Sequence, residues 1–222
     1  MYVRTRLRER RGVLGFVGVM MLAAGAVAQA ASTDGKQGLI ALGTSMPAFR
    51  LPDVVSGKLV SPDDFAGRKA MLLIVTCRHC PYAQHVKDGI ARLARDYADK
   101  SIGMIAISAN DPAGYPDDAP DRLKEMAVKA GFVFPLVFDE TQETAKALTA
   151  VATPDFFLFD QQRRLVYRGQ FDASRPGNGK PVTGSDVRVA IDALLSDRPI
   201  PERQVPSFGC SIKWKAGSRP AY

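Results

Sequence analysis

Cysteine and histidine are scarce in this 222-residue sequence: it has three cysteines, which join segments covalently or bind metals, and two histidines, which bind metals. Cys77 and Cys80 form a single Cys-x-x-Cys, and the second such pair that usually completes a structural zinc site is missing. A metal site made of Cys77, Cys80, His85 and Cys210 is an alternative that these counts disfavour. We therefore predict a protein without a bound metal or cofactor.

A strong positive charge is also lacking once the N-terminus is set aside. The chain has 30 basic and 23 acidic residues, but residues 1–30 hold five of the basic residues and one of the acidic ones. The remaining 192 residues have 25 basic and 22 acidic residues, a net charge of +3, without an Arg/Lys stripe interleaved with aromatic residues. We therefore predict no nucleic-acid partner, and one domain without internal repeats.

The N-terminus has the three-part pattern of a secretory signal peptide. Five arginines precede an apolar stretch from Gly12 to Val27, and cleavage is expected after Ala28 or Ala30. The stretch is short for a membrane span, and an arginine pair before it also matches the twin-arginine type of export signal. We expect residues 1–30 to be removed and the mature protein to be periplasmic or otherwise exported, without stable membrane insertion.

The Cys-x-x-Cys lies between an apolar run and a helical pattern. Residues 71–75 predict a buried strand, because their apolar side chains are continuous and branched. From Pro81 to Tyr97 apolar residues recur at helical spacing, and the proline occupies the first turn, where its missing N–H costs nothing. This junction places the first sulfur at a helix N-terminus, where unpaired N–H groups stabilise a thiolate. The pattern indicates a thiol–disulfide redox site.

Strands and helices alternate along the rest of the chain. The predicted strands are 48–51 and 58–60 (a hairpin), 70–76, 102–107, 136–138, and the pair 156–159 and 165–169; the predicted helices are 81–97, 121–130, 139–149 and a last helix capped by Ser185. Strands joined by helical crossovers should be parallel, and the last pair antiparallel. Residues 110–120, with three prolines and a glycine, are predicted to form a surface loop.

This order of elements and several short segments resemble the thioredoxin superfamily. The segments are 77–82 (CRHCPY), 108–111 (SAND), 139–142 (DETQ), 153–157 (TPDFF), 169–172 (GQFD), 174–176 (SRP) and 209–215 (GCSIKWK). Within the superfamily the chain is similar to the peroxiredoxin-like branch, related to alkyl hydroperoxide reductases and thiol-specific antioxidants, and to exported members with a Cys-x-x-Cys-Pro site. The resemblance covers residues 43–216.

The resemblance implies an α/β, thioredoxin-like fold, with a central mixed sheet flanked by helices and an N-terminal hairpin extension. We expect residues 31–198 to form the redox domain, of which 31–42 are a loose lead-in. Residues 199–222 are expected to form a C-terminal tail packed on that domain.

The resemblance also implies dithiol–disulfide exchange through the two neighbouring cysteines. Cys77, as the exposed thiol, would attack a substrate disulfide, and Cys80 would resolve the mixed disulfide. Positive charge from His79 and Arg78 would lower the pKa of Cys77, although a solvent-facing His79 without a role is the alternative. Arg78 and Pro81 are expected to contact substrate.

Thr153-Pro154 matches the place where thioredoxin-like folds have a cis-proline facing the cysteines. The resemblance implies a cis bond there, whereas an ordinary trans proline at the start of the next strand is the alternative. Pro154 is a predicted catalytic residue and Thr153 a predicted substrate-binding residue, because backbone groups beside the proline can pair with an extended substrate. The expected partners are disulfides of proteins or small thiols and an unidentified redox partner, and the expected state is a monomer.

Two positions depart from the patterns of the superfamily. A buried acid usually precedes the first cysteine by six residues; Met71 stands there instead, which leaves three candidate substitutes, Asp155, Glu140 and Asp172. A peroxide-reactive cysteine needs a Thr or Ser three residues before it, and Ile74 holds that position before Cys77. A thiol peroxidase with antioxidant activity that uses Cys77 is therefore the second choice after disulfide exchange.

The third cysteine leaves the count odd, which in an exported protein indicates a free or transiently paired thiol. Cys210 could be a third redox thiol beside Cys77 and Cys80, could bridge two chains, or could be an inert thiol packed by Ile212 and Trp214. A structural role for the Cys77–Cys80 disulfide, without exchange, is a further alternative.

Overall fold

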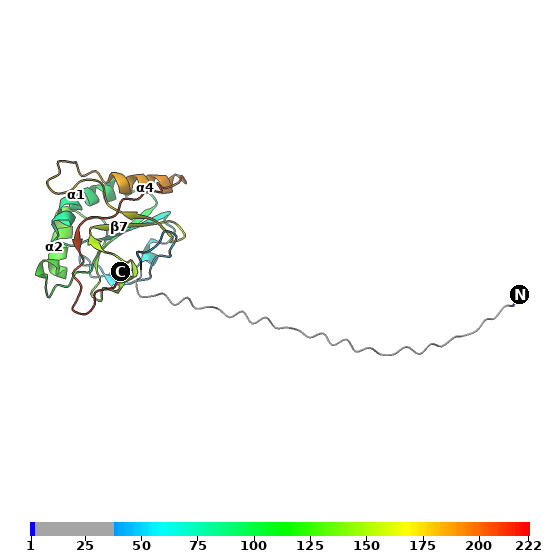
Figure 1. The fold of residues 1–222 in the computed structure, drawn as a ribbon, viewed down its shortest axis with the longest axis horizontal. Helices are drawn as coiled ribbons and strands as arrows, with labels where there is room; N and C mark the ends of the chain where they lie inside the picture. The colour runs from blue at the N-terminus through cyan, green and yellow to red at the C-terminus, as the bar shows by residue number, and fades with distance from the viewer. Residues whose placement is uncertain (3–37) are drawn as a thin grey trace. The chain divides into compact units, whose positions relative to one another are not determined.

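The computed structural model of the chain describes residues 1–2 and 38–222 (Figure 1). The predicted signal peptide and most of the predicted lead-in lie outside the described residues. Residues 38–222 belong to one unit, to which the following description applies. Within the described residues, no helix combines the length and apolar character that crossing a bilayer requires.

A mixed sheet of five strands, in the order β5-β4-β3-β7-β8, forms the centre of this unit. The central strand β3 (Ala70–Val75) is buried along its whole length and pairs in parallel with β4 (Ile102–Ser108) and antiparallel with β7 (Asp155–Phe159). On the outer sides, β5 (Leu136–Phe138) runs parallel to β4, and β8 (Leu165–Gly169) runs antiparallel to β7. The sheet confirms the predicted thioredoxin-like fold class.

Apolar side chains fill both faces of this sheet. The helices of the described part of the chain are α1 (Pro81–Asp96), α2 (Pro120–Ala130), α3 (Glu143–Ala147) and α4 (Ser185–Leu195), with the 3-10 turns η1 (Pro62–Phe65) and η2 (Pro116–Asp118). Successive strand residues point to opposite faces. Leu72 and Ile74 therefore pack with residues of α1, α2 and α4, whereas Leu73 and Val75 pack with residues of α3 and the C-terminal segment.

Two short antiparallel pairs lie outside the main sheet. In the first, β1 (Leu51–Pro52) pairs with β2 (Leu59–Val60), which confirms the predicted N-terminal hairpin. In the second, β6 (Ala152–Thr153) pairs with β9 (Cys210–Ser211), so the C-terminal segment returns to the residues that immediately precede Pro154.

The loop predicted at the surface over residues 110–120 is exposed at residues 113–117 and 120, but two of its side chains are buried. It begins with Asn110, which is buried, and contains η2, whose last residue Asp118 has no exposed surface. Both side chains are buried because they hydrogen-bond to other segments, as described below. At two helix starts the prediction is wrong by smaller margins: α3 begins at Glu143 rather than beside Asp139, and Gly184, not Ser185, is the N-cap of α4.

Gly103 of β4 lies where the sheet has no room for a side chain. A Cβ atom there would come within 2.6 Å of Met71 Sδ and 2.7 Å of Phe65 Cδ1. Overpacking of this kind costs about 1–3 kcal/mol, so we expect Gly103→Ala to lower the free energy of unfolding by that amount in urea titrations. Gly114→Ala is the matched control, because its Cβ would meet nothing within 4 Å, and equal effects of the two changes would contradict this packing.

Candidate redox site

The two cysteines of the Cys-x-x-Cys lie where β3 gives way to α1. Cys77 follows the last residue of β3 by two positions, and Cys80 is the N-cap residue of α1. Both are free thiols with 0% exposed surface, so the prediction that Cys77 is exposed is wrong. Cys77 is covered because it packs with Cys80, Ala83 and Cys210, the last of which comes from the C-terminal segment.

Thr153 contacts both buried thiols. Its hydroxyl oxygen lies 3.2 Å from Cys77 Sγ, and its carbonyl oxygen accepts a hydrogen bond of 3.1 Å from the Cys80 thiol. The Thr153–Pro154 bond is cis, as expected from the resemblance. The structure therefore brings the Thr153–Pro154 segment and the cysteine pair into one site, although Cys77 and Thr153 are 76 positions apart in the sequence.

The two thiols titrate as a pair. The pKa of Cys80 is lowered from its ordinary value of 9.0 to about 4, chiefly because the Cys77 thiol hydrogen-bonds to it, with help from the thiol of Cys210 and the N–H of Ala83. The same hydrogen bond raises the pKa of Cys77, and burial and the charge of Asp118 raise it further. These opposite shifts favour a pair in which one sulfur carries a negative charge while the other keeps its proton.

Either sulfur can hold that charge. The Thr153 carbonyl beside Cys80 favours a proton on Cys80, and the Thr153 hydroxyl can donate to a thiolate at Cys77. The N–H of Ala83 in the first turn of α1 favours the charge on Cys80. A short proton shift between the sulfurs therefore makes Cys77 available as a nucleophile.

The lowered first pKa gives the reduced protein a defined pH dependence. Between about pH 4 and pH 9 the two cysteines bind fewer protons in the folded protein than in the unfolded one. Their contribution to the free energy of unfolding therefore rises with pH in this window and is lost as the pH falls toward 4. We expect the thiolate absorbance near 240 nm to disappear on acidification with a midpoint near pH 4 in the wild type. In Cys77→Ser or Cys80→Ser the midpoint should move up by several units, and an unchanged midpoint would contradict the shared proton.

A buried carboxylate that sequence analysis missed holds the residues between the cysteines. One oxygen of Asp118 accepts the backbone N–H groups of Arg78 at 2.6 Å and His79 at 3.0 Å. The other oxygen bonds His79 Nδ1 and accepts the side-chain amide of Asn110 at 2.8 Å. Asp118 itself has no exposed surface. Asp118, and none of the three proposed substitutes, is the acid beside Cys77.

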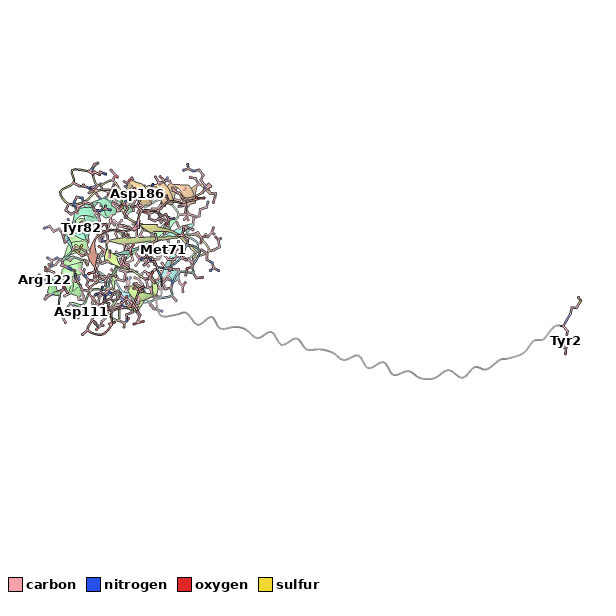
Figure 2. All side chains as sticks on the ribbon, viewed as in Figure 1. Tyr2, Met71, Tyr82, Asp111, Arg122 and Asp186 are labelled. Atoms are coloured by element: carbon pink, nitrogen blue, oxygen red, sulfur yellow. The ribbon has the colours of Figure 1, made fainter. Side chains whose placement is uncertain are left out.

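The three proposed acids have other surroundings. Glu140 is exposed, and Asp172 accepts backbone N–H groups of its own loop at Ser174 and Gly184. Asp155 is buried, pairs with Arg168 at 3.2 Å and accepts the hydroxyl of Ser207, and burial raises its pKa. Met71, at the position of the superfamily's acid, is labelled in Figure 2; it is fully buried and packs in an apolar cluster with Leu73 and Val75.

The positive side chains predicted to lower the pKa of Cys77 are paired with carboxylates. Arg78 lies 3.2 Å from Asp117 and 3.8 Å from Glu125, while the ring of His79 bonds Asp118 and stacks obliquely on Tyr115. The predicted electrostatic cause is therefore wrong. His79 contributes instead to the network that fixes the loop between the cysteines.

One set of metal-binding atoms exists among the described residues. A donor atom of each of Cys77, His79 and Asp118 lies within 4.8 Å of the others. Sulfur, imidazole and carboxylate are zinc ligands, so this set could hold such an ion. The alternative set from the sequence is not assembled, because His85 hydrogen-bonds to Ser174 Oγ at 2.7 Å instead of approaching the thiols.

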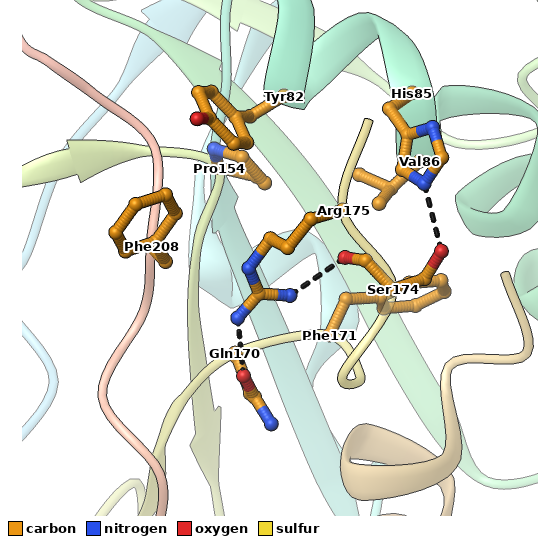
Figure 3. Close-up of a pocket in the computed structure, with 9 residues that line it drawn as sticks. All are labelled: Tyr82, His85, Val86, Pro154, Gln170, Phe171, Ser174, Arg175 and Phe208. Carbon is orange, nitrogen blue, oxygen red and sulfur yellow. Dashed lines mark hydrogen bonds between the residues drawn. The ribbon is translucent and has the colours of Figure 1, made fainter. Parts of the chain in front are cut away.

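A small groove adjoins Pro154 on the side of α1 (Figure 3). Its volume is about 10 Å³, and its lining residues are Tyr82, His85, Val86, Pro154, Gln170, Phe171, Ser174, Arg175 and Phe208. The Tyr82 and Phe208 rings meet edge to face with centroids 5.2 Å apart, and the Arg175 guanidinium lies 5.5 Å from the Phe208 centroid. The groove has room for about one water molecule, and the Arg175 guanidinium donates to the carbonyls of Asp172 and Ser174 within the protein.

The comparison with protein families gives a match to the Redoxin family over residues 41–183. The chain belongs to the Redoxin family. The matched Redoxin region contains Cys77, Cys80, Asp118 and Pro154 but ends before Cys210. Together with the fold, the match places this Redoxin protein among the oxidoreductases of the thioredoxin superfamily.

Solved structures resemble this Redoxin protein over most of its length. An uncharacterized conserved protein from Geobacillus kaustophilus is 48% identical, with a TM-score of 0.78, and the match covers 80% of this chain and 94% of that one. A hypothetical protein from Sinorhizobium meliloti 1021 is 42% identical, with a TM-score of 0.79, over 83% of this chain and 100% of that one.

A more distant structure shares the fold. The thioredoxin domain of a thiol-disulfide oxidoreductase from Bacteroides vulgatus is 18% identical, with a TM-score of 0.51, over 67% of this chain and 97% of that one. No protein with a curated description matches the chain.

Proposed function

We propose that this Redoxin protein is a thiol–disulfide oxidoreductase that exchanges electrons through Cys77 and Cys80. The observation that carries the proposal is the pair of buried, adjacent thiols at the start of α1, both in contact with Thr153. A thiolate is the attacking species in disulfide exchange, and a neighbouring thiol closes the cycle. Both requirements are met here without a bound cofactor.

The reaction proceeds in two exchanges. Cys77, after passing its proton to Cys80, attacks a substrate disulfide; a Cys77–substrate bond forms, the substrate's S–S bond breaks, and one substrate sulfur leaves as a thiolate. Cys80 then loses its proton and attacks Cys77, which releases the second substrate sulfur. The substrate gains two electrons and the protein becomes the Cys77–Cys80 disulfide. The reverse sequence oxidises a substrate dithiol.

The residues around the pair have positioning roles in this proposal. Thr153 can donate to a Cys77 thiolate through its hydroxyl, and its carbonyl accepts the Cys80 thiol when the proton lies on Cys80. Arg78 is half-buried and Pro81 is exposed, so both are available at the rim to a substrate that enters beside Pro154. His79 and Asp118 hold the loop between the cysteines.

Export is part of the proposal. It is supported by the arginine-rich, apolar and small-residue pattern of residues 1–30. In an oxidising compartment the pair would cycle between its thiol and disulfide forms with a separate redox partner, which would fix the direction of electron flow. We propose a monomer as the working form.

A thiol peroxidase is the second candidate, and one contact favours it. The Thr153 hydroxyl lies 3.2 Å from Cys77 Sγ, where it could hold a peroxide oxygen although Ile74 cannot. Ile74, which stands where a peroxide-reactive cysteine needs a Thr or Ser three residues before it, argues against a peroxidase.

The proposed function is tested by mixing the reduced mature protein with oxidised glutathione and with a peptide disulfide. We expect rapid formation of the Cys77–Cys80 disulfide and release of the substrate thiol. Both products are measured by mass spectrometry of samples alkylated at successive times. A rate no higher than that of free cysteine with both substrates would show that the pair does not exchange.

A further inference from the structure

The C-terminal segment occupies the backbone edge beside the two thiols. In the β6–β9 pair Cys210 lies directly opposite Thr153, and Thr153 Oγ1 reaches the Cys210 carbonyl at 3.4 Å. The carbonyl of Thr153 accepts the Cys80 thiol on its other side. An extended peptide that adds to a sheet edge is held in the same manner. The protein's own chain thus takes the position of an extended substrate.

Contacts on both sides hold this strand in place. On the N-terminal side the carbonyl of Val205 accepts the N–H of Gln170 at 3.0 Å. On the C-terminal side the N–H of Lys213 donates to the Asn110 side chain at 2.8 Å, and its carbonyl accepts the N–H of Asp111 at 2.9 Å. Cys210 is therefore fixed between two anchored segments.

Gly209 allows the strand to approach this closely. A Cβ atom at this residue would lie 2.0 Å from the Thr153 carbonyl oxygen and 3.2 Å from Pro154 N. Both are backbone atoms, which cannot rotate away as a side chain can. A side chain at residue 209 is thus incompatible with the observed pairing.

The thiol of Cys210 meets the active pair. Cys210 packs against the cluster of Cys77, Cys80 and Ala83, and its thiol helps to stabilise the Cys80 thiolate. Cys77 and Cys80 have no exposed surface, whereas Cys210 is only partly buried. Ile212 and Trp214, the proposed surroundings of an inert thiol, pack in a different cluster with the residues of β3 and α3.

We propose that Cys210 is a third redox thiol, which the C-terminal strand presents to the Cys77–Cys80 disulfide as an internal substrate. Deprotonated Cys210 attacks Cys80 Sγ; the Cys80–Cys210 bond forms, the Cys77–Cys80 bond breaks, and Cys77 leaves as a thiolate that takes up the proton lost by Cys210. The number of disulfides is unchanged, so no further oxidant is needed. The proposal rests on the proposed function, because exchange supplies the first disulfide.

Oxidation of the pair makes this attack easier. Burial and the neighbouring Cys80 raise the pKa of Cys210 to about 11 in the reduced protein. Once Cys80 is part of a disulfide it carries no charge and no longer raises the pKa of Cys210. The transfer moves the disulfide from two fully buried cysteines to a pair that includes the partly buried Cys210, which a redox partner could contact.

The test uses the mature protein with Cys77→Ser, in which Cys80 and Cys210 remain. After stoichiometric diamide, alkylation and non-reducing peptide mapping, we expect an intrachain Cys80–Cys210 disulfide whose rate of formation does not depend on protein concentration. Adding Gly209→Ala should slow this step about tenfold or more, because it displaces the strand and lowers the effective concentration of the thiol. Adding Gly114→Ala, whose Cβ meets nothing within 4 Å, should leave the rate unchanged.

Other products would overturn the proposal. Dimers linked through Cys210 would show that it bridges two chains. If Cys80 and Cys210 both stay reduced, or each reacts with the oxidant without joining the other, Cys210 is inert. Exchange by Cys210→Ser with oxidised glutathione reports on Cys77 and Cys80 alone. If that exchange is fast and the internal disulfide does not form, only the role of Cys210 fails; if that exchange is missing, the proposed function fails.

Discussion

Cys77→Ser is expected to abolish thiol–disulfide exchange, and Cys80→Ser to stop it after one step. A thiol with the ordinary pKa of 9.0 is only about 1% thiolate at pH 7, and serine supplies no thiolate at all. Without Cys77 the attacking sulfur is lost, so turnover should fall about 100-fold or more. Without Cys80 the Cys77–substrate disulfide cannot be resolved, and it should accumulate as a single adduct in the intact mass spectrum.

Both variants must remain folded for this result to count. Serine is close to cysteine in size, so thermal unfolding should stay cooperative in each. Full turnover by Cys77→Ser, or the absence of an adduct in a folded Cys80→Ser, would contradict the assigned order of attack.

Asp118→Ala is expected to have the largest effect on stability. The change leaves the N–H groups of Arg78 and His79, the His79 ring and the Asn110 amide without their shared acceptor in a buried place. Removing one partner of such a buried network costs about 3 kcal/mol or more, which corresponds to a decrease in Tm of roughly 6–12 °C for a domain of this size. Differential scanning calorimetry of the reduced protein measures it.

The neighbouring Asp117→Asn is the matched control. Asp117 also contacts Arg78, but its side chain is 69% exposed, so its loss should change stability by less than about 1 kcal/mol. Asp118→Asn should fall between the two and should lower the pKa of Cys77, because it removes the charge that raises it. Equal destabilisation by Asp117→Asn and Asp118→Ala would contradict the claim that the buried Asp118 network stabilises the fold more than an exposed ion pair does.

The fold could be predicted from the sequence because its main elements have strong local patterns. The apolar run of β3, the helical spacing after Pro81 and the glycine that ends α2 each depend on neighbouring residues alone. Helix starts such as that of α3 were less accurate: the Asp139 side chain does accept the N–H of Ala145 in the first turn, but three residues separate it from the helix start at Glu143.

The features that were missed depend on segments far apart in the sequence. Asp118 stands in a proline-rich stretch that looks like a surface loop, and its burial follows from N–H groups 39 and 40 positions away. The role of Asp118 had one indication in the sequence. This residue follows β4, whose C-terminal end lies beside that of β3, the parallel strand that leads to Cys77. Cys77 is covered by a strand that begins at Cys210, and no local pattern near either cysteine indicates this contact.

The most direct test of the central claim compares two oxidants of the reduced mature protein. Stopped-flow measurements would follow loss of the Cys77–Cys80 dithiol with hydrogen peroxide and with a disulfide such as oxidised glutathione, in the wild type and in Cys77→Ser. We predict fast, Cys77-dependent exchange with the disulfide and a rate with peroxide close to that of free cysteine. A Cys77-dependent peroxide reaction far faster than the disulfide reaction would contradict the account and make the protein a thiol peroxidase.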